Sequence, residues 1–182
     1  MNNPIYAKSY GVLINPTWQE QVEREPLLAF SFILSTRNNQ LATIADEIIE
    51  LLDSGISPKF IDGSKVTKAG ILTWLWLLGA YEIIRTMCQA KSCFSSEAMS
   101  KLLPLKRKLA KVRMPDAKME KQGKKEPVIS SRSPWCEIPE SKDLLIGDPE
   151  EAYSAKAIID EYFSVVYSLS EKDILGTHEE SY

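Results

Sequence analysis

The segment AGILTWLWLLGAYEIIR, residues 69–85, is apolar on every side when it is wound as an α-helix. Such a helix is surrounded by other elements, because none of its faces favours water. Ser64 is a suitable N-cap residue, so the sequence predicts a helix over residues 65–91 at the centre of the domain. The apolar run is shorter than the roughly 20 residues that a bilayer requires. Because Glu82 and Arg85 also follow it at once, we expect no membrane span.

The segments before this helix are less regular. Thr17 is a candidate cap for a short helix that Pro26 closes. Residues 27–34, LLAFSFIL, are apolar without a clear period, so both a strand and a helix remain open. From Asn39 onward, apolar residues recur at helical spacing, and Ser54-Gly55 supplies a stop.

The segments after it also favour helices. Ser95 or Ser96 caps a helix that Pro104 kinks or restarts, and Pro115 ends or bends it. Gly, Pro and Ser punctuate residues 118–147, which predicts a long loop with short strands near 127–130 and 135–138.

The sequence around residue 148 has the pattern of a helix start. Asp148 is suited to the N-cap, Pro149 to the first helical position and Glu151 to a capping box. They predict a closing helix from residue 148 to about residue 169.

The predicted fold class is therefore mainly α. It is a helical bundle around a central apolar helix, with a long loop that has room for a short β-hairpin. We expect three parts: an N-terminal segment over residues 1–37 packed on the core, the bundle over residues 38–170, and a flexible acidic tail over residues 171–182.

Positive charge is concentrated in one block. Residues 101–132 contain eleven Lys and Arg against three Asp and Glu, a net charge of +8, whereas the whole chain carries −3. Such a block indicates an anionic partner, or an internal partner within the acidic remainder. The candidate binding residues for RNA or an acidic protein are Lys106, Arg107, Lys108, Lys111, Lys121, Lys124, Lys125 and Arg132.

Other chemistry has little support. The three cysteines are Cys88, Cys93 and Cys136, an odd number that favours a reducing, cytoplasmic compartment over a disulfide framework. The only histidine, His178, has no Cys or His neighbour at zinc-ligand spacing, so we expect no metal site. No glycine-rich phosphate loop is present, and we expect no cofactor.

Two groups of residues could carry chemistry. Glu82 and Arg85 lie one turn apart, either as an ion pair where the helix re-enters water or at the floor of a polar cleft. Arg113 and Lys118 flank Pro115 and could hold a phosphate, with Asp116 orienting the Arg113 guanidinium. A solvated, mixed-charge helix end is the alternative for this second group.

The order of these features resembles the HEPN superfamily of small helical bundles. The resemblance covers residues 38–170 and lies in Tyr81, Glu82 and Arg85, followed by Arg113 on the next helix. It implies a role in nucleic-acid metabolism, toxin–antitoxin pairs or defence, and it implies a homodimer. Active members are metal-independent ribonucleases in which an Arg is followed, after four to six residues, by a His.

This sequence departs from that pattern at the decisive position. Lys118 stands where the His belongs, and Met114 follows Arg113 where the family has a polar residue. An ordinary lysine stays protonated near neutral pH and cannot accept a proton as imidazole does. The resemblance therefore indicates a non-catalytic module that binds RNA or an acidic protein. One alternative is a ribonuclease that uses Arg113, Lys118, Glu82 and Arg85, and the other is a structural homodimer without a nucleic-acid role.

Overall fold

The computed structural model describes residues 5–7, 14–120, 123, 126–128, 133–148 and 150–181. The helices are α1 (Trp18–Arg24), α2 (Leu27–Phe30), α3 (Phe32–Gly55), α4 (Gly63–Gln89), α5 (Ser96–Lys118) and α6 (Ala155–Tyr167). The strands are β1 (Ile56–Ser57), β2 (Phe60–Ile61), β3 (Trp135–Ile138), β4 (Asp143–Asp148) and β5 (Glu151–Ser154). The protein is mainly helical, which confirms the predicted class.

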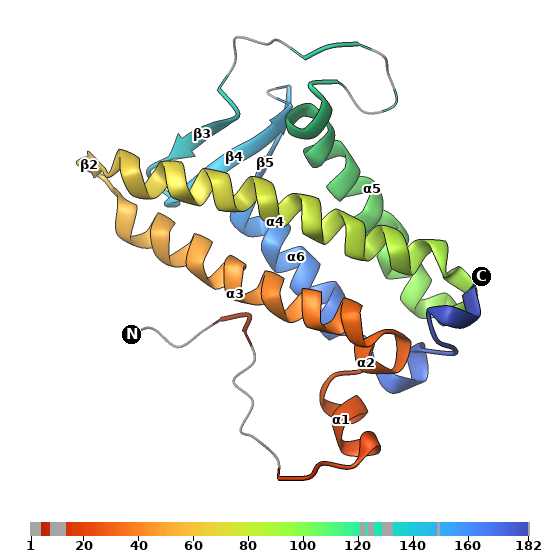
Figure 1. Ribbon diagram of the computed structural model, residues 1–182. Coiled ribbons are helices and arrows are strands. Elements are labelled where there is room, and N and C mark those ends of the chain that lie inside the picture. Colours follow the sequence, from red (N-terminus) through yellow and green to blue (C-terminus); the bar gives the residue numbers. More distant parts are fainter. Residues whose placement is uncertain are drawn as a thin grey trace.

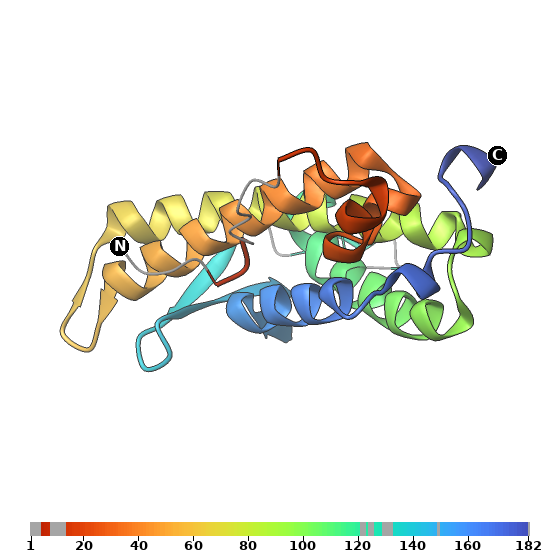
Figure 2. The same ribbon diagram turned by 90° about the horizontal axis from the view of Figure 1, so that it is seen from below.

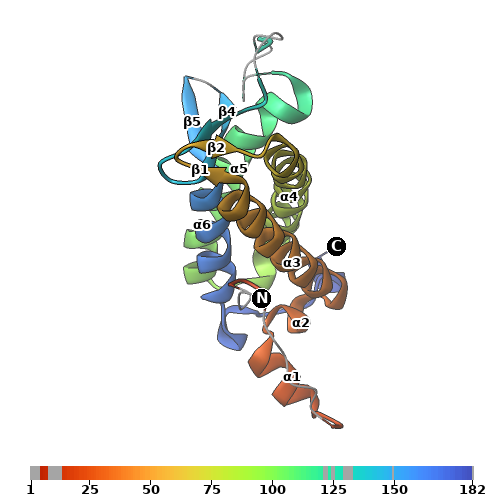
Figure 3. The same cartoon turned by 90° about the vertical axis from the view of Figure 1, so that its left-hand side faces the viewer.

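The long helices form two layers. α3 and α4 run side by side in opposite directions, and the β1–β2 hairpin joins them (Figure 1). α5 packs against α4, and α6 packs against α5 and α3, so the second layer lies beneath the first (Figure 2). The three-stranded sheet sits at one end of the molecule and α1 at the other (Figure 3). One hydrophobic core runs through all four long helices.

The central helix is α4, but it is not enclosed on every side. Trp76 is fully buried and Leu77 nearly so, as expected. Ile71, Trp74 and Leu75, however, keep 48%, 43% and 46% of their surface exposed. The expectation that other elements surround this helix is therefore wrong. α3 and α5 cover two sides of α4, and these three side chains stay about half exposed on another side.

The ends of α4 follow local capping rules. Asp62, rather than Ser64, is the N-cap, and its carboxylate accepts hydrogen bonds from the backbone N–H groups of Ser64 and Lys65. The Ser64 hydroxyl also donates to this carboxylate at 2.6 Å, and this bond, followed by those from the backbone, holds the pKa of Asp62 below its ordinary value. By length and composition alone α4 could cross a membrane, a property that core helices of soluble proteins share.

Residues 27–34 are helical, which resolves the ambiguity of LLAFSFIL. α2 covers the first half, and Ser31 then caps α3 by accepting a hydrogen bond from the Leu34 backbone N–H. α3 thus begins at Phe32 instead of Asn39, and it spans the boundary expected between residues 37 and 38.

α5 is one continuous helix through both of its prolines, which excludes the restart expected as one alternative at Pro104 and the end expected as one alternative at Pro115. An interior proline costs a helix about 3 kcal/mol because it removes a hydrogen bond and crowds the preceding turn. Leu102 and Leu105 flank Pro104 and are buried, as are Leu109 and Val112 further along. The packing of this apolar stripe offsets the local cost.

The predicted helix start at Asp148 is also wrong, because β4 and β5 pair there as antiparallel strands. β4 pairs with β3 from Trp135↔Ile146 to Ile138↔Asp143, and with β5 from Leu145↔Ser154 to Asp148↔Glu151. Leu144 and Ile146 point into the core, which favours a strand over the capping box. α6 starts at Ala155, and its cap Ser154 accepts a hydrogen bond from the Ala157 backbone N–H.

The strand predicted at residues 135–138 is present as β3. Within 127–130, Pro127 forms one isolated bridge to Glu120, while residues 129 and 130 lie outside the described part of the chain.

The described C-terminal residues are held against the bundle, in contrast to the expected loose tail. Leu175 donates its backbone N–H to the Cys93 carbonyl at 2.9 Å, and His178 donates to the Phe30 carbonyl at 2.9 Å. Asp173 accepts a hydrogen bond from the Ser95 hydroxyl at 2.6 Å. This segment therefore closes the end of the bundle where α4 meets α5.

Candidate functional site

Arg113 lies on the side of α5 that faces α4. The buried stripe that ends at Val112 sets the rotation of α5 and places the next side chain at this seam. The Arg113 guanidinium carbon lies 4.2 Å from the centroid of the Tyr81 ring, a cation–π contact. Its Nε is fully buried without an acceptor, and its Nη2 reaches the Met114 sulfur at 3.8 Å. Most of the donor capacity of this cation is thus unused within the described part of the chain.

Two more cations lie along the same seam. Arg85 is one turn beyond Tyr81 on α4, and Cys88 follows on the same side of the helix. Burial raises the pKa of the Cys88 thiol, and the nearby charge of Lys106 opposes this rise. Arg113, Arg85 and Lys106 define what we call the α4–α5 seam.

Glu82 and Arg85 form an ion pair on the helix surface. The Arg85 Nη2 lies 2.6 Å from the Glu82 Oε2, and the Arg85 Nη1 donates to Gln89 at 2.9 Å. The side chains of Arg85 and Glu82 are 37% and 52% exposed. This arrangement matches the ion-pair alternative, in which the helix re-enters water at this point.

Lys118, the fourth predicted catalytic residue, ends α5 and is exposed. It makes no ion pair or hydrogen bond with Arg113, Glu82 or Arg85. The structure thus places the Arg113 guanidinium against the ring of Tyr81, the residue before Glu82. Lys118 is not bonded to this group of residues. The Asp116 side chain, expected to orient Arg113, lies outside the described part of the chain, as do Lys121, Lys124, Lys125 and Arg132.

The basic residues of α5 divide into two groups. Lys108 pairs with Glu161 of α6, and Lys111 lies 2.9 Å from Glu151 of β5. The hydrogen bond between Lys111 and Glu151 raises the pKa of the lysine and lowers that of the carboxyl group. Lys108 and Lys111 therefore hold elements of the bundle together.

Lys101 of α5 also has a partner, Glu97 one turn away at 3.5 Å, but the two basic residues between Lys101 and Lys108 are different. Within the described part of the chain, neither Lys106 nor Arg107 makes an ion pair, and Arg107 is exposed. The charge block thus has internal partners at some positions and none at others.

His178 cannot supply an imidazole to Arg113. It binds Phe30 through its backbone, and its ring lies edge-on to the Phe30 ring, with centroids 5.4 Å apart. The neighbouring Thr177 carbonyl accepts from Cys93, close to the start of α5. At 1.5 Å per residue, Arg113 lies about 27 Å further along that helix.

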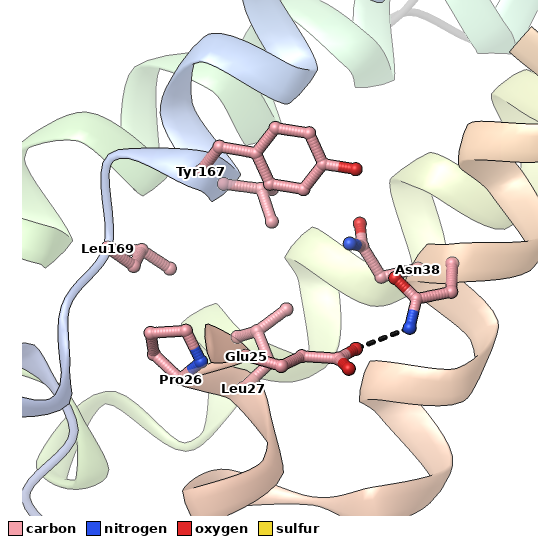
Figure 4. Close-up of a pocket in the computed structure, with 8 residues that line it drawn as sticks. Glu25, Pro26, Leu27, Asn38, Tyr167 and Leu169 are labelled. Atoms are coloured by element: carbon pink, nitrogen blue, oxygen red, sulfur yellow. Dashed lines mark hydrogen bonds between the residues drawn. The ribbon is translucent and has the colours of Figure 1, made fainter. Parts of the chain in front are cut away.

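A second site that no sequence motif indicates is a pocket where α2 and α3 meet the end of α6. Glu25, Asn38 and Tyr167 are among its lining residues (Figure 4). These residues lie far apart in the chain and form no motif. Only the packing of three elements brings them together.

Among the described residues, no group of three or more His, Cys, Asp or Glu side chains could hold a metal ion. No family model matches the chain, and neither the curated proteins nor the solved structures contain a detectable match to it.

Proposed function

We propose that this chain is a HEPN-like module that binds the phosphates of single-stranded RNA through the α4–α5 seam and the exposed cations beside it, without efficient catalysis. The proposal rests on the environment of Arg113. Its half-buried guanidinium stacks on the Tyr81 ring, and its Nε has no hydrogen-bond acceptor among the described residues. An arginine fork without an acceptor among the described residues is suited to a phosphate oxygen. Arg107 and Lys118 add exposed positive charge on the same helix.

The resemblance connects such a module with toxin–antitoxin or defence systems. The three free cysteines fit a reducing compartment, and we propose a cytoplasmic location.

Salt dependence of RNA binding tests this proposal. The logarithm of the binding constant should fall linearly with the logarithm of salt concentration, by about 0.7 per phosphate contacted on a single strand. Arg107→Gln should reduce the slope by about one such contact. Lys108→Gln removes the same charge one residue away, but from an internal pair, and should leave the slope unchanged.

Fluorescence anisotropy with a labelled oligonucleotide gives both slopes. Absence of binding at low salt, or equal effects of the two variants, would contradict the proposal.

A ribonuclease that uses Arg113, Lys118, Glu82 and Arg85 is the catalytic alternative. It lacks an imidazole near Arg113, because Lys118 stands where the His belongs and His178, the single histidine of the chain, lies at the other end of α5. We therefore expect no cleavage of single-stranded RNA in the presence of a chelator. Chelator-resistant cleavage that disappears in Arg113→Ala would favour the nuclease instead.

A homodimer is a second candidate, which the exposed apolar stripe of α4 favours. Ile71, Trp74 and Leu75 lie on one face at i, i+3 and i+4 and keep nearly half of their surface exposed. Docking of the basic block on the acidic face of α3 is less suitable, because Glu47 and Asp53 already pair with Lys68 and Lys156. We therefore propose that an α4–α4 contact forms any dimer.

Sedimentation velocity should then show a dimer for the wild type and a monomer for Trp74→Ser. Trp18→Ser, at a tryptophan on α1 that is 60% exposed, is the matched control and should remain dimeric. A wild-type monomer at all concentrations would exclude the dimer.

A further inference from the structure

The pocket between α2, α3 and the end of α6 shares no residue with the α4–α5 seam. Leu27, Leu169 and Pro26 supply apolar walls, and the Tyr167 ring forms another side (Figure 4). Glu25 and Asn38 supply the polar groups that face the same space (Figure 4). A few polar groups in an apolar pocket are typical of sites for small molecules.

Glu25 brings an uncompensated negative charge to the pocket. Its Oε1 accepts hydrogen bonds from the Ser35 hydroxyl and the Asn39 side-chain amide. Its Oε2 accepts none from the described residues, and no described cation forms an ion pair with it. A carboxylate that is partly withdrawn from water favours a positively charged partner.

Asn38 brings an unused donor. Its side chain is buried, with 3% of the residue exposed, and its Oδ1 accepts a hydrogen bond from the Tyr162 hydroxyl at 3.0 Å. Its amide nitrogen donates to no described group. The pocket is where this donor can find an acceptor.

We propose that the pocket binds a protonated amine that carries an oxygen acceptor on the adjacent carbon. The ammonium group would bind the Glu25 Oε2, and the oxygen would accept from the Asn38 amide nitrogen. Two sources share this chemistry, a free amino alcohol such as ethanolamine and the first residue of a peptide, with its ammonium and carbonyl groups. The inference is independent of RNA binding.

Calorimetric titration of the full chain with a small set of probes tests both groups at once. Ethanolamine represents the amino alcohol and glycinamide the peptide N-terminus. Ethylamine lacks the oxygen and acetamide lacks the charge. Loss of one charge-assisted hydrogen bond corresponds to about ten- to hundredfold weaker binding. Ethylamine should therefore bind weaker than the better of the first two probes, and acetamide weaker still.

Glu25→Gln keeps the size of the side chain and an acceptor for Ser35, and it should weaken binding of the better probe about tenfold or more. Glu23→Gln is the matched control, because Glu23 is exposed on α1, two residues away, and does not line the pocket.

Three results would overturn the proposal: no saturable binding of either first probe, equal affinity for ethylamine, or unchanged affinity in a folded Glu25→Gln variant. If that variant does not fold, the comparison among the four probes decides. A site that holds water only would give the first of these results.

Discussion

Charged residues that lie far apart in the sequence meet in the folded chain. Lys111 pairs with Glu151 across 40 positions, and Lys156 pairs with Asp53 across 103. Each exposed pair contributes little to stability, because water screens it. Such internal pairs neutralise part of the positive charge of α5. Arg107 and Lys118 remain exposed and can bind an external partner.

Asp173 predicts how stability depends on pH. The Ser95 hydroxyl and then the Ser170 backbone N–H hold the pKa of Asp173 below its ordinary value. A lowered folded-state pKa means that the stabilisation is complete above the unfolded value, near about 4, and is lost as pH falls through the folded value. Asp173→Asn should therefore lower the melting temperature at neutral pH, and the gap to the wild type should narrow toward about pH 3.

Thermal unfolding followed by circular dichroism measures this gap across the pH range. Glu50→Gln is the control, because Glu50 is exposed on α3 without a described partner, and its effect should not change with pH. A gap for Asp173→Asn that stays constant down to low pH would contradict the assignment.

At the scale of elements, close packing decides where strands and helices meet. Gly70 of α4 faces the Trp135 ring of β3, and a Cβ added at Gly70 would lie 2.8 Å from three atoms of that ring. Position 70 therefore requires glycine, because any larger side chain would collide with the Trp135 ring. Glycine lets the sheet approach the central helix, although it weakens a helix interior by roughly 1 kcal/mol relative to alanine.

Gly70→Ala should therefore destabilise the protein by about 1–3 kcal/mol, because the overpacking exceeds the gain in helix propensity. Gly63→Ala, at the first residue of the same helix, meets nothing within 4 Å and should leave stability unchanged or slightly raised. Urea unfolding measures both changes. If the two variants are equally stable, the Trp135 ring does not pack on α4.

At the scale of the whole molecule, an N-terminal strap joins the two layers. The backbone N–H groups of Ile5, Tyr6 and Ala7 donate to the two oxygens of Asp46 on α3, at 2.8, 2.9 and 2.8 Å. The Tyr6 ring stacks on Phe163 of α6, with ring centroids 4.8 Å apart. Burial and then the hydrogen bond to Asp160 raise the pKa of the Tyr6 hydroxyl.

Asp46→Ala should release this strap, because three backbone donors lose their charged acceptor at once. Amide hydrogen exchange at Tyr6 and Ala7 should become faster by on the order of tenfold or more, while exchange in the core of α4 stays slow. Glu50→Ala, one turn along α3 at an exposed residue, should change neither rate. Unchanged protection at Tyr6 in Asp46→Ala would show that the stacking on Phe163 holds the segment by itself.

The sequence by itself determined the helical class and the central helix. The reason is that the spacing of apolar residues reports which face of a helix is buried. The ion pair between Glu82 and Arg85 was one of the two alternatives that the sequence left open, since residues at i and i+3 are neighbours in any helix.

Only the tertiary structure decided which local signal prevailed where two of them competed. The capping residues at Asp148 favour a helix, but Leu144 and Ile146 gain more by packing on the bundle as a strand. Pro104 favours a break, but the stripe through Leu105 keeps α5 continuous. Contacts between distant segments decide which cations remain unpaired, and they bring Glu25 and Asn38 into one pocket. No local sequence pattern encodes such contacts.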